Sequence, residues 1–313
     1  MNTHILVTGG AGFIGSALVE RLLQNSQYTV VVVDDLSTGN RRKLPDETTP
    51  NFKFIHCDVN DYQSIAAVMH SYKFEYVFHY AALVGVLRTQ AHPLKVLQDI
   101  DGFRNICSLS KNTGVKRVFF ASSSEIYGEP FEIPQHVHTT PLNSRVPYAI
   151  VKNVGEAYLK SYFQEYGLEY TIFRFFNTYG PKQSRDFVVS KFMIKALRNE
   201  NIEIYGDGKQ TRTFCYIDDN VEACVNALEH NLVVNDIVNI GGNREISIQE
   251  LAEIIISKSH SSSSIIYVDP LKDGDMTRRC PDNTRMREVL LKRDLLSLES
   301  GIEKLLQIGL FDY

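Results

Sequence analysis

The sequence lacks the features that mark several classes of protein. Lys and Arg number 33 against 37 Asp and Glu, so the formal net charge is −4 and there is no basic excess. Nucleic acids and anionic membranes attract proteins through such an excess, so neither is expected as a partner. No run of about 18 apolar residues occurs, and the chain does not open on a basic stretch followed by an apolar one, so neither a membrane span nor a signal peptide is predicted. A cytoplasmic location is expected.

Cysteine is also scarce, with five residues that are widely spaced and never form a C-x-x-C pair. This pattern favours reduced thiols over disulfides or a zinc site, and the histidines show no metal-ligand spacing, so no metal is expected. What is present is ordinary for a globular protein, with 43% hydrophobic and 22% charged residues. A length of 313 residues indicates one large domain or two modest ones.

A glycine-rich turn follows the first apolar run. The run at 4–7 leads into Thr-Gly-Gly-Ala-Gly-Phe-Ile-Gly at 8–15, a helical period follows over 14–22, and a second apolar run lies at 28–33. This order predicts a strand, a tight turn, a helix and a second strand, which is the opening of a dinucleotide-binding unit. The glycines with the G-x-x-G-x-x-G spacing are Gly9, Gly12 and Gly15.

Asp34 ends the second strand, about twenty residues after the glycines. A carboxylate there accepts ribose hydroxyls and repels a 2′-phosphate, so NAD is favoured over NADP. Arg41 and Arg42 are candidates for holding a 2′-phosphate, although a solvated loop is the simpler interpretation. Asp58 follows a further predicted strand, and its position fits an adenine contact and a turn-forming residue equally well.

Strands and helices continue to alternate through the next hundred residues. Parallel strands separated by helices predict an α/β fold with a doubly wound sheet covered on both faces, and the ligand of such a sheet lies at its carboxyl edge. The further strands are predicted at 52–55, 76–79 and 117–121, and the helices at 66–70 and 96–109.

A tyrosine and a lysine stand one helical turn apart at Tyr148 and Lys152, so both project from one face. Pro147 suits the first position of the helix, and Gly167 can end it. A nearby ammonium stabilises a phenolate, which would make Tyr148 a general base. With 16 tyrosines in the chain such a pair also arises by chance, and the serines at 122–124 alone fit a helix cap or a loop.

Together with other motifs, these residues resemble the extended short-chain dehydrogenase/reductases that modify nucleotide sugars, the NAD-dependent epimerase/dehydratase family. The resemblance extends over essentially the whole chain. Its carriers are Thr8-Gly-Gly-Ala-Gly-Phe-Ile-Gly15, Asp34-Asp-Leu-Ser-Thr-Gly39, His79-Tyr-Ala-Ala82, Ser122-Ser-Ser-Glu-Ile-Tyr-Gly128, Tyr148-x-x-x-Lys152, Phe176-Asn-Thr-Tyr-Gly-Pro181, Tyr205-Gly-Asp-Gly208, Arg212-Thr-Phe-Cys-Tyr-Ile-Asp218 and Arg279-Cys-Pro-Asp282.

The resemblance implies a Rossmann-type doubly wound parallel sheet with a smaller C-terminal substrate-binding domain. Residues 1–175 would form the NAD-binding domain, with a returning segment near 236–260 that includes a strand at 237–240. Residues 176–313 would mainly bind the nucleotide sugar. A further helix is predicted to open with a capping box at Ser247 and Glu250. The resemblance also implies a homodimer that pairs the helix at 148–165 with that at 96–109.

The resemblance further implies roles for individual residues. Ser123 would bond the sugar hydroxyl being oxidised, Tyr148 would remove its proton, and Lys152 would hold the nicotinamide ribose, with Glu125 as a fourth catalytic candidate. Asp99 and Lys272 depart from the family, which often has asparagine and arginine there. The expected NAD-binding residues are Gly9, Gly12, Phe13, Ile14, Gly15, Asp34, Asp35, Ser37, Thr38, Gly39, Asp58, Val59, Tyr80, Ala81, Ala82, Tyr148 and Lys152, and the expected substrate-binding residues are Ser124, Asn177, Arg212, Lys272 and Arg279.

The expected reaction is oxidation of a sugar hydroxyl, at carbon 4, of a nucleoside-diphosphate sugar by tightly bound NAD. The favoured outcome is 4-epimerisation or net formation of the 4-keto sugar. Ser124 followed by Glu125 is also similar to UDP-glucuronate decarboxylases and to some dehydratases, and Arg279 resembles the arginine that decarboxylases place beside the sugar carboxylate. Decarboxylation and 4,6-dehydration therefore stay open as alternatives. A non-catalytic NAD-binding regulator is the alternative from another class, because a fold does not determine a function.

Overall fold

The computed structural model describes residues 2–270 and 276–310, and the chain forms two compact units. Unit 1 comprises Met1–Ile126, Ser144–Arg174 and Val221–Val238. Unit 2 comprises Tyr127–Asn143, Phe175–Asn220 and Asn239–Tyr313. The assignment of residues 1–175 to NAD and of 176–313 to the substrate stays a prediction.

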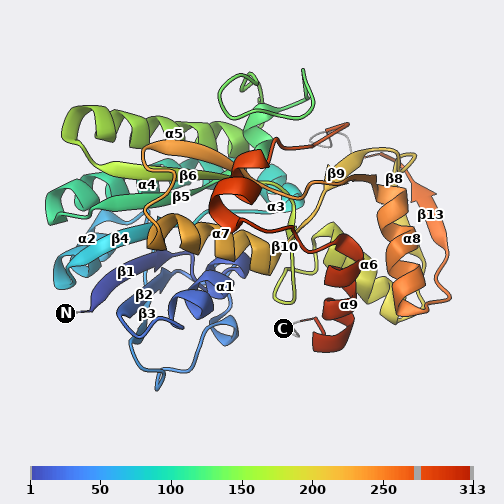
Figure 1. Ribbon diagram of the computed structural model, residues 1–313, viewed down its shortest axis with the longest axis horizontal. Coiled ribbons are helices and arrows are strands. Elements are labelled where there is room, and N and C mark those ends of the chain that lie inside the picture. The colour runs from blue at the N-terminus through green and yellow to red at the C-terminus, as the bar shows by residue number, and fades with distance from the viewer. Residues whose placement is uncertain (1, 271–275, 311–313) are drawn as a thin grey trace. The chain divides into compact units, whose positions relative to one another are not determined.

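A seven-stranded sheet forms the centre of unit 1, in the order β11-β6-β5-β4-β1-β2-β3 (Figure 1). The pairs β1–β2, β1–β4, β2–β3 and β4–β5 are parallel. The doubly wound α/β fold is thus confirmed, and so is the returning strand, β11, which lies beside β6. The strands are β1 Thr3–Thr8, β2 Tyr28–Asp34, β3 Phe52–His56, β4 Phe74–His79, β5 Arg117–Ser123, β6 Glu169–Phe175 and β11 Asp236–Ile240.

The central strands are apolar because helices cover both faces of the sheet. Val30 to Val33 of β2 are all fully buried, as expected for a parallel strand with two covered faces. Helices α4 and α5 pack against each other on one face, and α1 lies on the opposite face (Figure 1). These helices are α1 Phe13–Leu22, α2 Tyr62–Ser71, α3 Val86–Ala91, α4 Pro93–Thr113, α5 Pro147–Tyr166 and α7 Ile217–Glu229, the last of which runs on from unit 2.

Helix α5 begins and ends where its sequence predicts. Pro147 occupies the start, where a helix has no use for a backbone N–H, and Gly167 follows the end with a left-handed φ of 73°. Because α5 starts at Pro147, Tyr148 lies in its first turn and Lys152 one turn later.

Unit 2 is built from two-stranded ladders and helices. Strands β7 and β10 are parallel, β9 and β12 are antiparallel, and β8 and β13 are parallel. The predicted capping box is seen at α8, where the Ser247 hydroxyl accepts a hydrogen bond from the Glu250 N–H at 3.0 Å. The elements are β7 Thr178–Tyr179, α6 Val188–Leu197, β8 Ile202–Tyr205, β9 Thr211–Thr213, β10 Cys215–Tyr216, β12 Glu245–Ser247, α8 Ile248–Ser259, β13 Ile265–Val268 and α9 Leu298–Ile308, with short helical turns η1 Arg41–Lys43 and η2 Ser124–Tyr127 in the rest of the chain and a π-helical turn, η3 Met286–Leu291.

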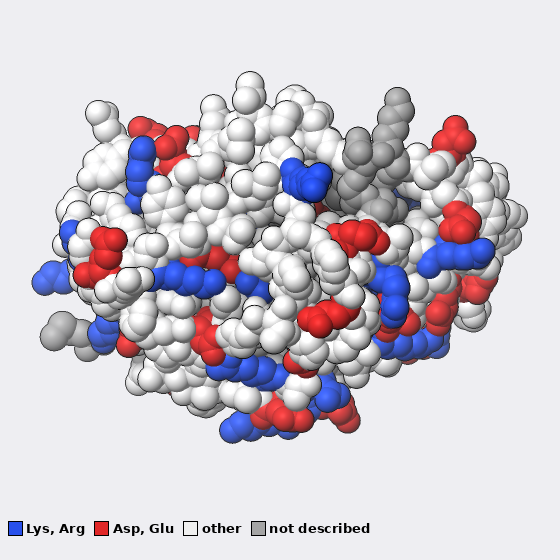
Figure 2. All heavy atoms as spheres, turned by 90° about the horizontal axis from the view of Figure 1, so that it is seen from above, with Lys and Arg blue, Asp and Glu red and all other residues white. Residues whose placement is uncertain are grey.

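Charges of both signs are mixed on the face of the molecule that Figure 2 shows, where blue and red side chains lie beside one another. Within residues 2–270 and 276–310, no helix is both long and apolar enough to cross a membrane. A cytoplasmic location stays a prediction.

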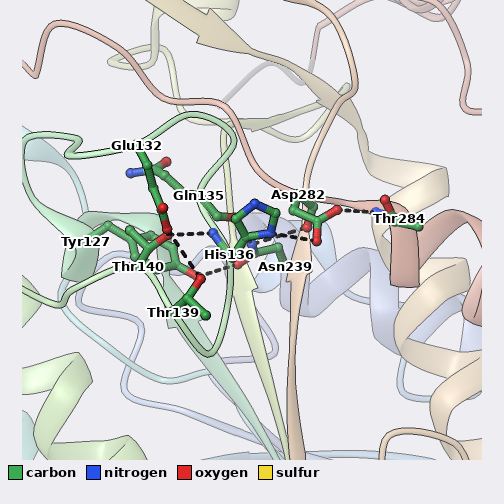
Figure 3. Close-up of polar contacts among 9 residues, drawn as sticks. All are labelled: Tyr127, Glu132, Gln135, His136, Thr139, Thr140, Asn239, Asp282 and Thr284. Atoms are coloured by element: carbon green, nitrogen blue, oxygen red, sulfur yellow. Dashed lines mark hydrogen bonds and ion pairs between the residues drawn. The ribbon is translucent and has the colours of Figure 1, made fainter.

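A polar network within unit 2 ties the loop after η2 to the segment before η3 (Figure 3). The Tyr127 hydroxyl donates to Asn239 Oδ1 at 2.8 Å, and Asn239 Nδ2 donates to the Gln135 carbonyl at 2.8 Å. The next residue after Gln135, His136, has its Nδ1 3.0 Å from Asp282 Oδ2. The Gln135 side chain is fully buried, yet neither of its amide atoms has a hydrogen-bond partner among the described residues.

We expect Gln135→Leu to raise the free energy of unfolding by about 1 kcal/mol, because an unpaired buried polar group costs roughly 1–3 kcal/mol. Urea unfolding of the purified variant measures the change. Asn239→Leu is the matched control and should lower the stability, because it breaks the bonds to Tyr127 and to the Gln135 carbonyl. A loss of stability in Gln135→Leu would contradict the interpretation of its amide as unpaired.

Candidate active site

The turn between β1 and α1 allows a close approach to the backbone. Gly9 has a φ of +67°, and a Cβ there would lie 2.6 Å from the Ala81 N. A Cβ at Gly15 would lie 2.3 Å from the Gly9 carbonyl oxygen. At Gly12, in contrast, a Cβ would meet one atom of the described chain within 4 Å, the Gly9 carbonyl oxygen at 3.1 Å. Gly9 and Gly15 are thus needed for packing, whereas a Cβ at Gly12 would be tight against that one oxygen and would have no other described neighbour in front of α1.

The N-terminus of α1 is suited to an anion. Gly12 caps the helix without a side-chain hydrogen bond, and the first turn, which holds Phe13 and Ile14, has no acidic residue. The first N–H groups of a helix have no partner within the helix and carry a partial positive charge. The space at Gly12 together with these amides fits the diphosphate of a dinucleotide.

Asp34 lies at the end of β2, beside this turn, and its side chain is buried. Its Oδ2 accepts from the Ala11 N–H at 2.9 Å and its Oδ1 from the Leu36 N–H at 2.8 Å. Burial raises the pKa of the Asp34 carboxyl, and these two hydrogen bonds oppose the rise. Each oxygen keeps a lone pair for a ribose hydroxyl. A Cβ at Gly39 would lie 2.6 Å from Oδ1, so glycine there keeps that oxygen clear.

The other residues predicted for the adenosine half lie in the loops after β2 and β3. Asp35 Oδ1 accepts from the Ser37 N–H at 3.0 Å and from its hydroxyl at 2.7 Å, and Thr38 follows in the same loop. Asp58 is exposed and accepts from the Asn60 N–H at 2.8 Å, which is the turn-forming role that its position also allows. Val59, the next residue, is buried.

The segment from Tyr80 to Ala82 is fixed by Thr8, a contact that the motifs do not reveal. The Thr8 hydroxyl oxygen accepts from the N–H groups of Tyr80 at 3.1 Å and Ala81 at 3.2 Å. Its proton is therefore left to donate to His79 Nδ1, at 2.8 Å, which places the imidazole proton on Nε2. Burial, and then Lys152, lower the pKa of His79 to about 3, so the ring is neutral.

Lys152 lies where α5 packs against β5. Its ammonium donates to the Ala121 carbonyl at 2.8 Å and lies 5.0 Å from the centre of the Phe120 ring and 5.7 Å from that of Tyr148. The side chain is 2% exposed. Burial lowers the pKa of Lys152 to about 8, and the charge of Asp99 opposes this effect.

Ser123 ends β5 and is buried, and Ser124 and Glu125 follow it in η2. The Ser123 hydroxyl oxygen accepts from the Glu125 N–H at 3.1 Å, so its proton is available to another oxygen. Glu125 itself is half-buried. Unit 1 thus brings together Lys152 and the Tyr148 ring on α5 with the end of β5 that carries Ser123.

Of the predicted substrate residues, Ser124 lies in unit 1, and Asn177, Arg212 and Arg279 lie in unit 2. Arg212 on β9 is 7% exposed and Arg279 is 6% exposed, and the Arg279 N–H donates to the Thr211 carbonyl at 3.3 Å, so two buried cations lie on neighbouring segments. Asn177 is half-buried, and its carbonyl accepts from the Cys215 N–H at 2.9 Å. Lys272 lies outside the described residues. Within the described ranges, no three His, Cys, Asp or Glu residues are grouped to hold a metal.

Comparisons with known proteins agree with this arrangement. Residues 5–241 match the model of the NAD dependent epimerase/dehydratase family. The chain is 36% identical to a UDP-N-acetyl-alpha-D-glucosaminuronate decarboxylase of Bacillus cytotoxicus, over 98% of both chains, and 36% identical to a putative UDP-glucose 4-epimerase of Methanocaldococcus jannaschii, over 96% of both. A solved UDP-glucose 4-epimerase of Thermotoga maritima, with UDP-glucose, superimposes with a TM-score of 0.90 at 34% identity and covers 96% of each chain.

The family match covers the Gly9–Gly15 turn, Ser123 and the Tyr148–Lys152 pair. The predictions of an enzyme and of NAD as its cofactor are confirmed at the level of the family, which leaves the alternative of a non-catalytic regulator without support. The named activities of the relatives differ, one being a decarboxylase and two being epimerases. The chain belongs to the NAD-dependent epimerase/dehydratase family, whose enzymes act on nucleotide sugars.

Proposed function

We propose that this enzyme oxidises the carbon-4 hydroxyl of a nucleoside-diphosphate sugar, and that the outcome is 4-epimerisation or net formation of the 4-keto sugar. The observation that carries the proposal is the Lys152 ammonium, which is fixed on the Ala121 carbonyl and lies 5.7 Å from the centre of the Tyr148 ring. A base, its activating cation and the adjacent Ser123 are the groups needed to remove a hydroxyl proton.

The described residues fit NAD. The amides at the start of α1 would bind its diphosphate, Asp34 its adenosine ribose, and Lys152 its nicotinamide ribose. When bound, NAD supplies a hydride acceptor for the sugar carbon. The open space at Gly12 and the remaining lone pairs of Asp34 support this assignment.

Three side chains would act on the sugar hydroxyl. Ser123, which accepts from the Glu125 N–H, has its proton left to donate to the sugar oxygen. The Tyr148 phenolate takes the hydroxyl proton, and the Lys152 charge stabilises the phenolate electrostatically. The protein thereby positions the reacting oxygen and neutralises the charge that develops on its own base.

Residues of unit 2 are proposed to bind the nucleotide sugar. Arg212 and Arg279 are buried cations, which suit a diphosphate or a carboxylate, and Asn177 supplies a neutral polar group. The Thermotoga maritima epimerase was solved with UDP-glucose, which supports a nucleoside-diphosphate hexose as the substrate class.

Decarboxylation of a nucleoside-diphosphate hexuronate is the second candidate. The Bacillus cytotoxicus relative is named as a decarboxylase of such a sugar. Glu125 in η2 would be an acid–base group, and the buried Arg279 would be a partner for the sugar carboxylate. A 4,6-dehydration would also need an acid–base group at Glu125.

We also propose that the enzyme is a homodimer that pairs α4 and α5 of two copies. These helices pack together within one chain and still expose large apolar side chains. Leu94 of α4 is 78% exposed and Tyr166 of α5 is 54% exposed. Burial of such side chains against a second copy would be favourable.

We expect Gly12→Ala to weaken NAD binding by about tenfold or more, because a methyl group would occupy the space in front of α1. Isothermal titration of the NAD-free protein measures the affinity. Gly114→Ala is the matched control: it adds a methyl in open space at a φ of +79°, so it should lower the stability and leave NAD binding unchanged. Equal affinity in wild type and Gly12→Ala would exclude this turn as the diphosphate site.

Tyr148→Phe should retain NAD binding and lower turnover by about 10²–10⁴-fold, which is the usual contribution of a general base. Turnover is measured with the nucleotide sugar that the wild-type enzyme converts. Tyr166→Phe makes the same change at the other end of α5 and should leave the rate unchanged. Full activity in Tyr148→Phe would remove this residue from the proposed mechanism.

The outcome of the reaction can be read from the mass of the product. Incubation with UDP-, GDP-, CDP- and dTDP-sugars should give an unchanged mass for an epimerase, or a loss of two hydrogens for a net dehydrogenase. Loss of carbon dioxide would establish the decarboxylase instead, and loss of water the dehydratase. Glu125→Gln should leave epimerisation or net oxidation intact, and it should abolish decarboxylation or dehydration. Absence of turnover across the panel would refute the proposed function.

A further inference from the structure

We propose that the carboxylate of Asp99 on α4 is the counter-ion of Lys152 on α5, and that this pair sets the pH range in which Tyr148 and Lys152 work. The inference rests on the proposed function of Tyr148 and Lys152, and it gives Asp99 a positioning and electrostatic role. Helices α4 and α5 pack against each other within unit 1. Phe103 of α4 lies against Gly155 of α5, where a Cβ would be 2.8 Å from the Phe103 ring. Asp99 and Lys152 each lie one turn before these contact residues, so both belong to the same helix interface.

The other groups that contact Lys152 offer no negative charge. The 2%-exposed side chain donates to the neutral Ala121 carbonyl at 2.8 Å and faces the rings of Phe120 and Tyr148. A buried ammonium is costly unless an anion accompanies it. In the described part of the chain, the anionic group whose charge acts on Lys152 is Asp99.

The other titratable groups around the pair do not replace Asp99. His79 on β4 feels the charge of Lys152 and is neutral, because burial lowers its pKa to about 3. Tyr148 lies one turn away on α5 and presents its ring. Asp58, after β3, acts on Asp99 and is exposed. The charge balance at the catalytic end of α5 therefore depends on Asp99.

Asp99 is held in place by a backbone donor. Its Oδ2 accepts from the Leu83 N–H at 2.8 Å. The Asn60 carbonyl is bound by Asn105 Nδ2 at 3.1 Å. Gly102, one turn after Asp99, allows Asn60 to approach α4, because a Cβ there would lie 2.7 Å from Asn60 Oδ1. The Asp99 carboxylate on α4 thus anchors the chain that follows Tyr80–Ala82.

The direction of the pKa shifts agrees with a mutually dependent pair. Burial raises the pKa of Asp99 and lowers that of Lys152, and each partner opposes the shift of the other. Without the carboxylate, Lys152 would lose its proton at a lower pH. The alkaline limb of the pH–rate profile, where Lys152 loses its proton, should therefore move toward acid.

Asp99→Asn tests the charge, since an amide oxygen can still accept from the Leu83 N–H. The pKa of Lys152 is about 8 in the folded protein and 10.5 ordinarily. Between these pH values the unfolded chain binds more protons than the folded one, so the free energy of unfolding rises with pH. In Asp99→Asn the folded-state pKa of Lys152 would be lower still, so this rise would begin at a lower pH. Urea unfolding of the NAD-free protein should therefore show a deficit in Asp99→Asn near neutral pH that shrinks or reverses above about pH 8.

Asp61→Asn is the matched control. Asp61 is exposed and caps α2. Its replacement by Asn removes one negative charge, as Asp99→Asn does, but this charge does not act on Lys152. Its effect on stability should be constant across this pH range. Asp99→Ser provides a second charge-free variant if Asp99→Asn does not fold. A deficit in the Asp99 variants that is the same at every pH would overturn the proposal, because it would reflect lost packing alone.

A double-mutant cycle isolates the pair on the same NAD-free protein. Lys152→Met leaves Asp99 buried without its cation, so adding Asp99→Asn in that background should raise the stability. In the wild-type background the same substitution should lower it near neutral pH. A coupling of about tenfold or more in the unfolding equilibrium is expected, which corresponds to about one pKa unit. Equal effects in the two backgrounds would contradict a counter-ion role.

Turnover provides the functional test. With the nucleotide sugar that wild type converts, the alkaline limb of the kcat/KM profile of Asp99→Asn should move to lower pH by about one unit, whereas Asp61→Asn should keep the wild-type profile. A lowered rate with an unmoved profile would overturn the role in setting pH. If wild type converts no nucleotide sugar, the proposed function fails, and the stability cycle still decides whether Asp99 and Lys152 are coupled.

Discussion

The buried ammonium of Lys152 is the constraint on which the candidate active site of unit 1 depends. A charge in this position has to be compensated by its surroundings, and the structure offers the Ala121 carbonyl at the end of β5 and the faces of two aromatic rings. The carbonyl fixes α5 against the sheet edge. Since Tyr148 precedes Lys152 by one helical turn, the same bond also determines where the phenol lies. One interaction thus joins the helix that carries Tyr148 to the strand that carries Ser123.

A second set of contacts connects the cofactor turn to this site. The Thr8 hydroxyl, at the end of β1, accepts hydrogen bonds from the N–H groups of Tyr80 and Ala81. It also donates one to His79, so it joins β1 and β4 at their carboxyl ends. Because His79 is neutral, it does not add a second positive charge beside Lys152. The absent Cβ of Gly9 lets the same segment approach the turn. The position of the glycine turn and the charge state near Lys152 are therefore set by one small group of residues.

The sequence predicts what depends on local pattern and misses what depends on distant contacts. Alternating apolar runs and helical periods predict the strands from β1 to β5, and Pro147 and Gly167 predict the ends of α5. The ladders β9–β12 and β8–β13 join residues far apart in the chain, and no periodicity indicates their pairing. The same holds for Thr8, whose bonds to the segment that follows β4 no motif indicates. The roles of Gly12, Asp34 and Tyr148 follow from spacing and resemblance, and they stay predictions that the local geometry supports.

The two units would neutralise the negative charge of their ligands with different groups. In unit 1 the candidate diphosphate site consists of backbone amides and an open space at Gly12, so it needs no basic side chain. In unit 2 the candidates are the buried side chains of Arg212 and Arg279. A hexuronate carries one negative charge more than a hexose, so the energetic choice between these sugars depends on how many cations face the sugar rather than on Tyr148 and Lys152. Two relatives of equal identity are named a decarboxylase and a putative 4-epimerase, so overall similarity does not choose between these sugars, and the choice is expected to depend on individual charges such as Arg212 and Arg279.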